Sequence, residues 1–219
     1  MTGEQLIDAA LEEIATFTDR IPNARAPWLR RLTTRQAEIF AIAAEISPDY
    51  LGRCLTATVA DPGTVDLSAA VLGIVPGVAP IERITLVEIA DPGTSGYAVG
   101  AEVAIVPTGD TERSAEPPRV RLRSDALLGV GADLALVDSV KVHYVRRPAP
   151  IRTLADSAEL VEPYVVLLVW DLAKTIMRRA GVGDAVRTAA VAVFEAEETA
   201  LLDLFRAHVA SFSPLHTRF

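Results

Sequence analysis

Apolar residues recur at intervals of three and four in the first fifty positions, which is the spacing of one face of an α-helix. Over Gly3–Phe17 they alternate with acidic side chains, so this segment predicts an amphipathic helix with an acidic outer face. A proline-containing link, Arg20–Trp28, follows. A second helix is expected to begin at Thr33 or Thr34, whose hydroxyl groups suit an N-cap, and to end near Ile46.

The pattern changes between residues 55 and 145. Short, partly alternating runs rich in β-branched residues are separated by clusters of glycine and proline, which predicts a small antiparallel sandwich or barrel. The apolar stretch Val71–Ile81 is either a buried crossover or a loop that packs on a neighbouring subunit. The expected strands are Thr56–Val59, Ile84–Ile89, Ala101–Val106, Arg119–Arg123 and Asp138–Val145.

Helical spacing returns in the last seventy residues. One helix is expected to begin with Pro163 at its first position and to run to Ala180, before a glycine. Its polar positions form a narrow stripe, so most of its surface should be covered by other helices. A last long helix is expected from Asp184, and Pro214 closes it.

This order of elements predicts an α+β protein with a discontinuous helical domain. Each terminal pair of helices is too small to fold alone, so the pairs should pack as one bundle. The bundle would comprise residues 1–50 and 148–214, with residues 51–147 as an inserted antiparallel β-rich wing. Residues 215–219 form a short tail.

Charge and hydropathy narrow the class of protein. The 219 residues include 29 acidic and 21 basic side chains, a net charge of −8, which argues against a uniformly basic nucleic-acid binder. The longest fully apolar run, Tyr164–Trp170, is far below the ~20 residues that a membrane-spanning helix needs. Acidic residues also occupy the place of a signal peptide's basic region. We therefore expect a protein that is made in the cytoplasm and has no membrane partner.

No residue pattern indicates catalysis or a bound cofactor. The single cysteine, Cys54, excludes a zinc site with several cysteines. The segment Gly129–Leu134 lacks the third glycine of a dinucleotide-binding loop and precedes a strand rather than a helix. His143, His208 and His216 have no acidic or histidine partner at ligand spacing. We expect no catalytic residue, no cofactor and no metal.

Arginines form the most distinctive charged pattern. Arg119, Arg121 and Arg123 alternate along an expected strand, so their side chains would share one face, and Arg146 and Arg147 add a second basic point. Two interpretations are open. The row is either a solvated face balanced by carboxylates of neighbouring strands, or a contact for DNA phosphates or an acidic partner.

Apolar faces of the last two helices are the expected contacts between subunits. The mean hydropathy of +0.29 favours surface that is buried within the protein or against other copies of it. The candidate interface residues are Val165, Leu168, Trp170, Phe194, Leu201 and Phe205.

Four segments resemble the head-to-tail adaptor (connector) proteins of tailed bacteriophages. Val140–Pro148 looks like the final strand of that family's β region, which ends in a proline, and Ala155–Tyr164 looks like the approach to its helical bundle. Val165–Arg179 is similar to the family's central apolar helix, and Glu195–Leu202 is similar to its acidic last helix.

The resemblance implies a non-enzymatic virion protein. It implies a ring, with twelve copies expected, that lies in the neck of the virion between the portal protein and tail or neck proteins. The genome would pass through the ring without sequence-specific binding, and net negative charge would keep DNA phosphates from adhering. A head-completion or tail-terminator protein is the nearest alternative. A small-molecule-binding or hydrolytic enzyme with a β cap is the alternative from another class, and a pocket lined by His143 with a nearby carboxylate would favour it.

Overall fold

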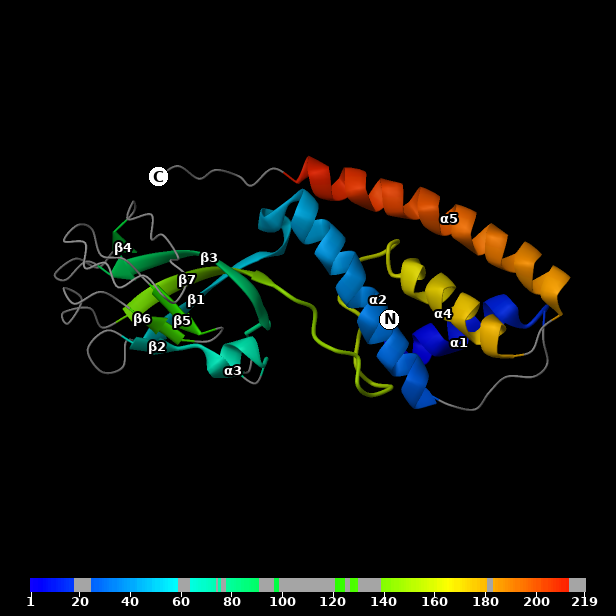
Figure 1. Ribbon diagram of the computed structural model, residues 1–219, viewed down its shortest axis with the longest axis horizontal. Helices are drawn as coiled ribbons and strands as arrows, with labels where there is room; N and C mark the ends of the chain where they lie inside the picture. The colour runs from blue at the N-terminus through cyan, green and yellow to red at the C-terminus, as the bar shows by residue number, and fades with distance from the viewer. Residues whose placement is uncertain are drawn as a thin grey trace. The chain divides into compact units, whose positions relative to one another are not determined.

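The protein is an α+β protein whose contacts divide it into two units (Figure 1). One unit combines Met1–Tyr50 with Pro148–Phe219, and the other is Leu51–Arg147. The expected strand Ala101–Val106 and the tail at 215–219 lie outside the residues that the structure describes. The computed structural model describes residues 1–17, 25–58, 64–73, 75, 78–90, 97–98, 121–124, 127–129, 139–180 and 183–212.

The first unit is built from helices at both ends of the chain. Side chains from all four helices meet in its core, and the largest fully buried ones include Leu6, Leu32, Leu172 and Phe205. The helices are α1 (Gly3–Ile14), α2 (Arg25–Ile46), α4 (Val166–Arg179) and α5 (Asp184–Ser211), and the 3-10 helix η1 (Pro48–Leu51) follows α2.

Helix α1 begins where its sequence places a capping box. The Thr2 hydroxyl accepts a hydrogen bond from the Gln5 backbone N–H at 3.3 Å, and the Gln5 side chain accepts one from the Thr2 N–H at 2.8 Å. The apolar face of the helix is buried, and its acidic residues face outward. The amphipathic helix predicted at this position is confirmed.

Two helix starts differ from the sequence prediction. Helix α2 begins at Arg25 rather than Thr33, because Pro27 lies in the first turn, where a backbone N–H has no helical partner to lose. Helix α4 begins at Val166 rather than Pro163. Residues 162–165 instead form turns, and the Val166 N–H donates to the Pro163 carbonyl oxygen three residues back.

Helix α4 is the most buried helix of this unit, and α5 is the least. Nine of the fourteen residues of α4 are buried, as its narrow polar stripe predicts. Helix α5 runs along one side of the unit and contacts α4 and α2 (Figure 1). It buries only one stripe of residues at helical spacing: Ala190, Phe194, Glu198, Phe205 and Val209.

The second unit contains two antiparallel sheets. The four-stranded sheet has the order β1-β7-β3-β4, and the three-stranded sheet has the order β2-β6-β5. Gly52 pairs with Val145 across β1 and β7, so the two ends of the unit lie side by side. The strands are β1 (Gly52–Thr58), β2 (Thr64–Asp66), β3 (Ile81–Ala90), β4 (Tyr97–Ala98), β5 (Arg121–Ser124), β6 (Leu127–Gly129) and β7 (Ser139–Arg146).

One hydrophobic core holds the described parts of this unit together. Val87 of β3 and Val142 of β7 pair in register and are fully buried, and Val65 of β2 belongs to the same cluster. The short helix α3 (Ser68–Val71) covers it through Ala70. The strand predictions near residues 56, 84 and 138 are confirmed, each with shifted ends.

The apolar stretch Val71–Ile81 is divided between helix, turn and strand. Val71, Val75 and Val78 pack against the core of the β unit, whereas Leu72 is 62% exposed. Gly73 has a φ of +68°, a backbone conformation that an L side chain rarely adopts. The three valines of this stretch thus cover the core of the β unit.

Candidate functional site

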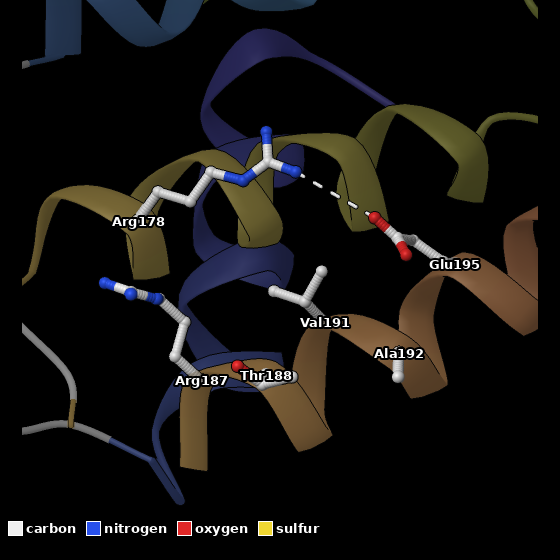
Figure 2. A pocket seen from close by; sticks show the side chains of 6 residues that line it. All are labelled: Arg178, Arg187, Thr188, Val191, Ala192 and Glu195. Carbon is white, nitrogen blue, oxygen red and sulfur yellow. Dashed lines mark ion pairs between the residues drawn. The ribbon is translucent and has the colours of Figure 1, made fainter. Parts of the chain in front are cut away.

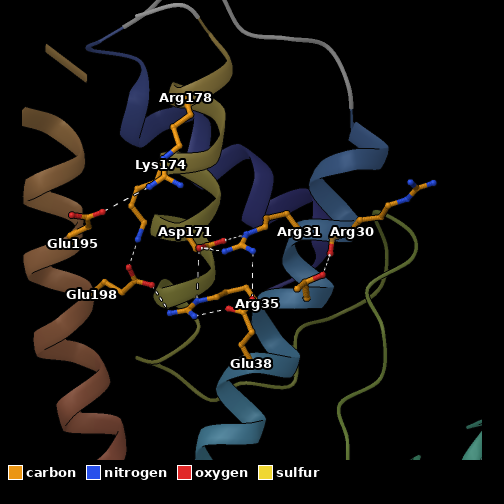
Figure 3. Close-up of polar contacts among 10 residues, drawn as sticks. Arg30, Arg31, Arg35, Glu38, Asp171, Lys174, Arg178, Glu195 and Glu198 are labelled. Atoms are coloured by element: carbon orange, nitrogen blue, oxygen red, sulfur yellow. Dashed lines mark hydrogen bonds and ion pairs between the residues drawn. The ribbon is translucent and has the colours of Figure 1, made fainter. Parts of the chain in front are cut away.

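A partly buried cluster of charged side chains lies where α2, α4 and α5 meet in the helical unit (Figure 3). Its cations come from α2 and α4, and its carboxylates come from all three helices. The members of this charged cluster are Arg31, Arg35, Glu38, Asp171, Lys174 and Glu198.

Asp171 joins α4 to α2. Its two carboxylate oxygens accept hydrogen bonds from Nε and Nη2 of Arg31, both at 2.6 Å, in the bidentate geometry that matches a guanidinium to a carboxylate. Nε of Arg35 lies 4.0 Å from the same carboxylate. Asp171 is only 6% exposed, so its charge depends on these two arginines for compensation.

Glu198 joins α5 to both other helices. Its Oε1 accepts a hydrogen bond from Nη2 of Arg35 at 2.6 Å, and its Oε2 accepts one from Nζ of Lys174. Glu38 completes the cluster, because its Oε2 accepts from Nη1 of Arg35 at 2.7 Å. Each helix therefore forms ion pairs with both of the other helices.

The cluster contains three cations and three carboxylates, and this balance shapes its electrostatics. The hydrogen bond to Asp171 raises the pKa of Arg31. Burial alone would lower the pKa of Arg35, but the hydrogen bond to Glu38 and the charges of Glu198 and Asp171 outweigh burial and raise it. Both guanidinium groups stay charged, so the cluster acts as a fixed connection between helices rather than as a proton donor.

Sequence reasoning found two of the six members of this cluster. It placed Asp171 and Lys174 on one stripe of a buried helix, but it assigned them no partners. Glu198 had no distinguishing signal, because it lies among exposed glutamates of α5. The spacing of Arg31 and Arg35, four residues apart on one face of α2, was the available signal.

A pocket of about 230 Å³ lies between the end of α4 and the start of α5 (Figure 2). Arg178 and Glu195 line it and form an ion pair at 3.9 Å, with both side chains more than half exposed. Figure 2 shows the guanidinium of Arg178 turned toward Glu195 and that of Arg187 turned away from it. The two arginines therefore do not converge on one bound group.

The described candidate arginines lie in both sheets of the β unit or directly after them. Arg121 and Arg123 lie in β5 of the three-stranded sheet, Arg146 lies in β7 of the four-stranded sheet, and Arg119 lies outside the described residues. A register shift between Leu122 and Ser124 places a bulge at Arg123, so strict alternation does not hold there. A DNA or partner contact at these arginines stays a prediction.

Arg147 has a role within its own unit. Its Nη2 donates a hydrogen bond to the Val71 carbonyl oxygen, and its backbone N–H donates to the Pro80 carbonyl oxygen at 2.9 Å. These bonds tie the end of β7 to the segment between α3 and β3. This arginine contributes to the fold of the β unit.

The predicted subunit interface is wrong for four of its six residues. Val165, Leu168, Phe194 and Phe205 are at most 5% exposed in a single chain, because they belong to the core of the helical unit. Trp170 and Leu201, the other two, are half-buried. Apolar spacing identified a helix face correctly, but it did not distinguish a face that covers the chain's own core from one that covers a neighbour.

An exposed apolar face on α5 is made of residues that are not among the six candidate interface residues. Val186, Val193 and Leu204 are 50%, 56% and 61% exposed, on a helix whose opposite side already covers the core. Exposed alanines continue the same face at intervals of three and four: Ala189, Ala196, Ala200 and Ala207. We call these seven residues the α5 outer stripe.

One histidine has a carboxylate neighbour in the β unit. Nε2 of His143 on β7 lies 3.3 Å from Oε1 of Glu88 on β3, and Lys141 lies 3.4 Å from the other oxygen of that carboxylate. Cys54, an exposed thiol on β1, pairs in register with His143. Among the described residues, no group of three or more histidine, cysteine or acidic side chains is arranged to hold a metal ion.

The comparisons with known proteins add no relative. No protein-family model matches the chain, and no curated protein sequence matches it. Within the described ranges, no helix is both long and apolar enough to cross a membrane.

Proposed function

We propose that this protein is a non-enzymatic structural component of a phage virion. It forms an adaptor ring in the neck, between the portal protein and the tail or neck proteins, and the genome passes through its lumen. It assembles in the host cytoplasm before it joins the particle. The proposal rests on the resemblance of four segments to the head-to-tail adaptors and on one structural observation.

That observation is the α5 outer stripe. The helical unit already has a complete core, to which α5 contributes Phe194 and Phe205. Val193 and Leu204 on the far side of the helix are more than half exposed. A contiguous apolar face of this kind in a folded unit favours contact with another protein surface. An assembly protein explains such a face better than an enzyme that works as a monomer.

Two further features support a ring component. The charged cluster holds α2, α4 and α5 in one register, and a repeating assembly needs subunits of fixed shape. The net charge of −8 suits a lumen through which DNA must slide, because like charges repel phosphates.

We also propose that the two sheets of the β unit pack as a sandwich. Val65 of the three-stranded sheet shares one hydrophobic cluster with Val87 and Val142 of the four-stranded sheet, which supports this arrangement.

Electron microscopy of the purified full chain, alone and mixed with the portal protein of the same virus, tests the proposed function. We expect rings with a central opening, and mass photometry should give about twelve times the 23.4 kDa of one chain. A chain that neither forms rings nor binds the portal would contradict the proposal. Binding to an assembled tail but not to the portal would favour a tail-terminator protein.

Binding to double-stranded DNA gives a second test. We expect no tight binding at physiological salt, since Coulomb repulsion opposes an acidic lumen meeting phosphates. Tight binding that weakens steeply as salt is added would contradict a passive lumen and would revive the candidate DNA contact at Arg121 and Arg123.

A hydrolytic enzyme with a β cap remains a second candidate. The contact of 3.3 Å between His143 and Glu88 favours it, because a carboxylate orients an imidazole for proton transfer. The pocket of Figure 2 lies on α4 and α5 and does not include His143. Turnover of ester or phosphoester substrates that is lost in His143→Ala would support this candidate over the first.

A further inference from the structure

The α5 outer stripe has the dimensions of a helix-packing face. From Val186 to Ala207 it covers twenty-one residue steps, which is about 32 Å at the rise of an α-helix. Four of its seven residues are alanines, and small side chains let a second helix approach closely. Two acidic residues border the stripe: Glu197, and Asp203, which forms an ion pair with Arg206 of the same helix at 2.8 Å.

A second exposed face on α2 complements the stripe in shape. Its residues recur at intervals of three and four over nineteen residue steps, about 28 Å, and most are small. They do not face the core of the helical unit, since every one is exposed in the single chain. We call this set the α2 outer stripe; its members are Ala26, Arg30, Thr34, Ala37, Ala41 and Glu45.

The two stripes also complement each other in charge. Figure 3 shows the side chain of Arg30 pointing away from the charged cluster. Within the described part of the chain, neither Arg30 nor Glu197 forms an ion pair. The α2 outer stripe carries Arg30 near its start and Glu45 at its end, so the expected attraction is local: Arg30 of one copy would attract Glu197 of the next, whereas two copies of the α5 stripe would bring their Glu197 carboxylates together.

We propose that α5 of one copy packs its outer stripe on the α2 outer stripe of the next copy. This inference rests on the proposed ring function and names the surfaces that build the ring. The contact is head-to-tail, because each copy uses two different surfaces, and such contacts close into rings when the rotation per copy permits.

The small area of each stripe makes ring assembly cooperative. Two helices in contact over about 30 Å bury well under the ~800 Å² per partner of a standard stable interface. One such contact between two copies is therefore weak, whereas ring closure gives every copy two of them. We expect few dimers and a cooperative transition from single chains to complete rings.

Site-specific cross-linking tests which surfaces meet. Cys54 is the only cysteine and is exposed, so Cys54→Ser provides a thiol-free background. Ala196→Cys and Ala37→Cys then place one thiol at the middle of each stripe, on separate chains that differ by a tag. A short bismaleimide should link tagged to untagged chains in the mixture, and neither variant alone should give a cross-linked dimer. The experiment is run with and without the portal protein.

A pair of valine substitutions tests the energetic contribution of the stripe. Val193→Asp should weaken self-association about tenfold or more, because it places a charge at the centre of the contact. Val161→Asp is the matched control, since Val161 is 54% exposed and lies outside both stripes, whereas Val193 is 56% exposed. Circular dichroism and thermal unfolding of both variants show that each still folds.

The outcomes separate this inference from the proposed function. Rings that form without a cross-link between the Ala196→Cys and Ala37→Cys chains would overturn the contact and leave the adaptor function standing. A cross-link in Ala196→Cys alone would show an α5–α5 contact and would overturn the head-to-tail arrangement. Single chains under all conditions, with or without portal, would overturn both proposals.

Discussion

Glu198 shows how one side chain can hold three helices. Its carboxylate on α5 accepts hydrogen bonds from Arg35 on α2 and Lys174 on α4, and all three groups are largely buried. Buried charges lose their hydration, so each depends on the others for compensation. Loss of one member leaves the remaining charges without partners in a medium of low dielectric constant.

Replacing Glu198 by glutamine should therefore destabilise the protein strongly. Glutamine keeps the shape but removes the charge that neutralises Arg35 and Lys174, and breaking a buried pair costs about 3 kcal/mol. Glu195→Gln, one turn earlier on the same helix, is the control. Its pair with Arg178 is exposed, and the expected cost is about 0.5 kcal/mol or less. Urea unfolding measures both, and equal losses would show that the cluster contributes nothing beyond a surface pair.

Asp156 makes stability depend on pH in the acid range. Hydrogen bonds from the backbone N–H groups of Thr153 and Arg152, both at 2.8 Å, hold the pKa of its carboxyl below the ordinary value of 3.8. A carboxyl with a lowered pKa in the folded state stabilises the fold above its unfolded pKa, and this contribution is lost as the pH falls through the folded pKa.

We expect Asp156→Asn to weaken the dependence of the free energy of unfolding on pH in the acid range. The free energy of unfolding of the wild type should fall as the pH drops below about 3.8, and the variant should fall less over the same range. Urea unfolding at a series of pH values measures the difference. Parallel profiles for the two proteins would show that the backbone hydrogen bonds do not favour the ionised carboxylate.

At the scale of elements, α1 is fixed by close packing at its first residue. Gly3 is buried, and its N–H donates a hydrogen bond to the Asp156 carbonyl oxygen at 2.8 Å. A Cβ atom at this position would lie 2.9 Å from the Thr153 carbonyl oxygen and 2.9 Å from a Leu29 methyl carbon. The start of α1 thus approaches the chain segment before α4 more closely than any side chain permits.

Gly3→Ala should therefore destabilise the protein, although alanine favours helices by about 1 kcal/mol over glycine. The carbonyl oxygen of Thr153 belongs to the backbone and cannot move without disturbing its segment, so we expect a net loss of about 1–3 kcal/mol. Gly183→Ala is the control, because nothing lies within 4 Å of the added Cβ. Thermal unfolding compares the two, and a stabilised Gly3→Ala variant would contradict the close packing.

At the scale of the whole molecule, the β unit is inserted into the helical unit between two neighbouring points of the chain. The first and last strands of the β unit pair with each other, and Gly52 lies opposite Val145. The insertion therefore begins and ends at neighbouring points. The helical unit has its own buried core, which includes Leu6, Leu32 and Leu172.

Replacing Leu51–Arg147 by a short glycine-serine linker should leave a folded helical unit. A linker of a few residues spans the distance between paired strands, and closing a short loop costs little entropy. Circular dichroism should show a helical protein that unfolds in one cooperative transition. A disordered product would show that the helical unit needs the β unit to fold.

Sequence alone settled the elements that depend on local pattern. Amphipathic spacing identified α1 and the long C-terminal helix, and β-branched runs identified β1, β3 and β7. Two helix starts were predicted wrongly, because Pro27 is tolerated within a first turn and Pro163 lies in turns that precede α4. A periodic pattern fixes which residues share a face but says little about where the helix begins.

Tertiary structure alone decided which face of α5 is buried and which charges meet. Both faces of α5 carry apolar residues at helical spacing, so periodicity could not tell Phe194, in the core, from Val193, on the surface. The arginine partners of Asp171 and Glu198 on α2 are 140 and 163 residues away in the chain. Burial and ion pairing are properties of packing between distant segments, and a local pattern contains no information about which segments will meet.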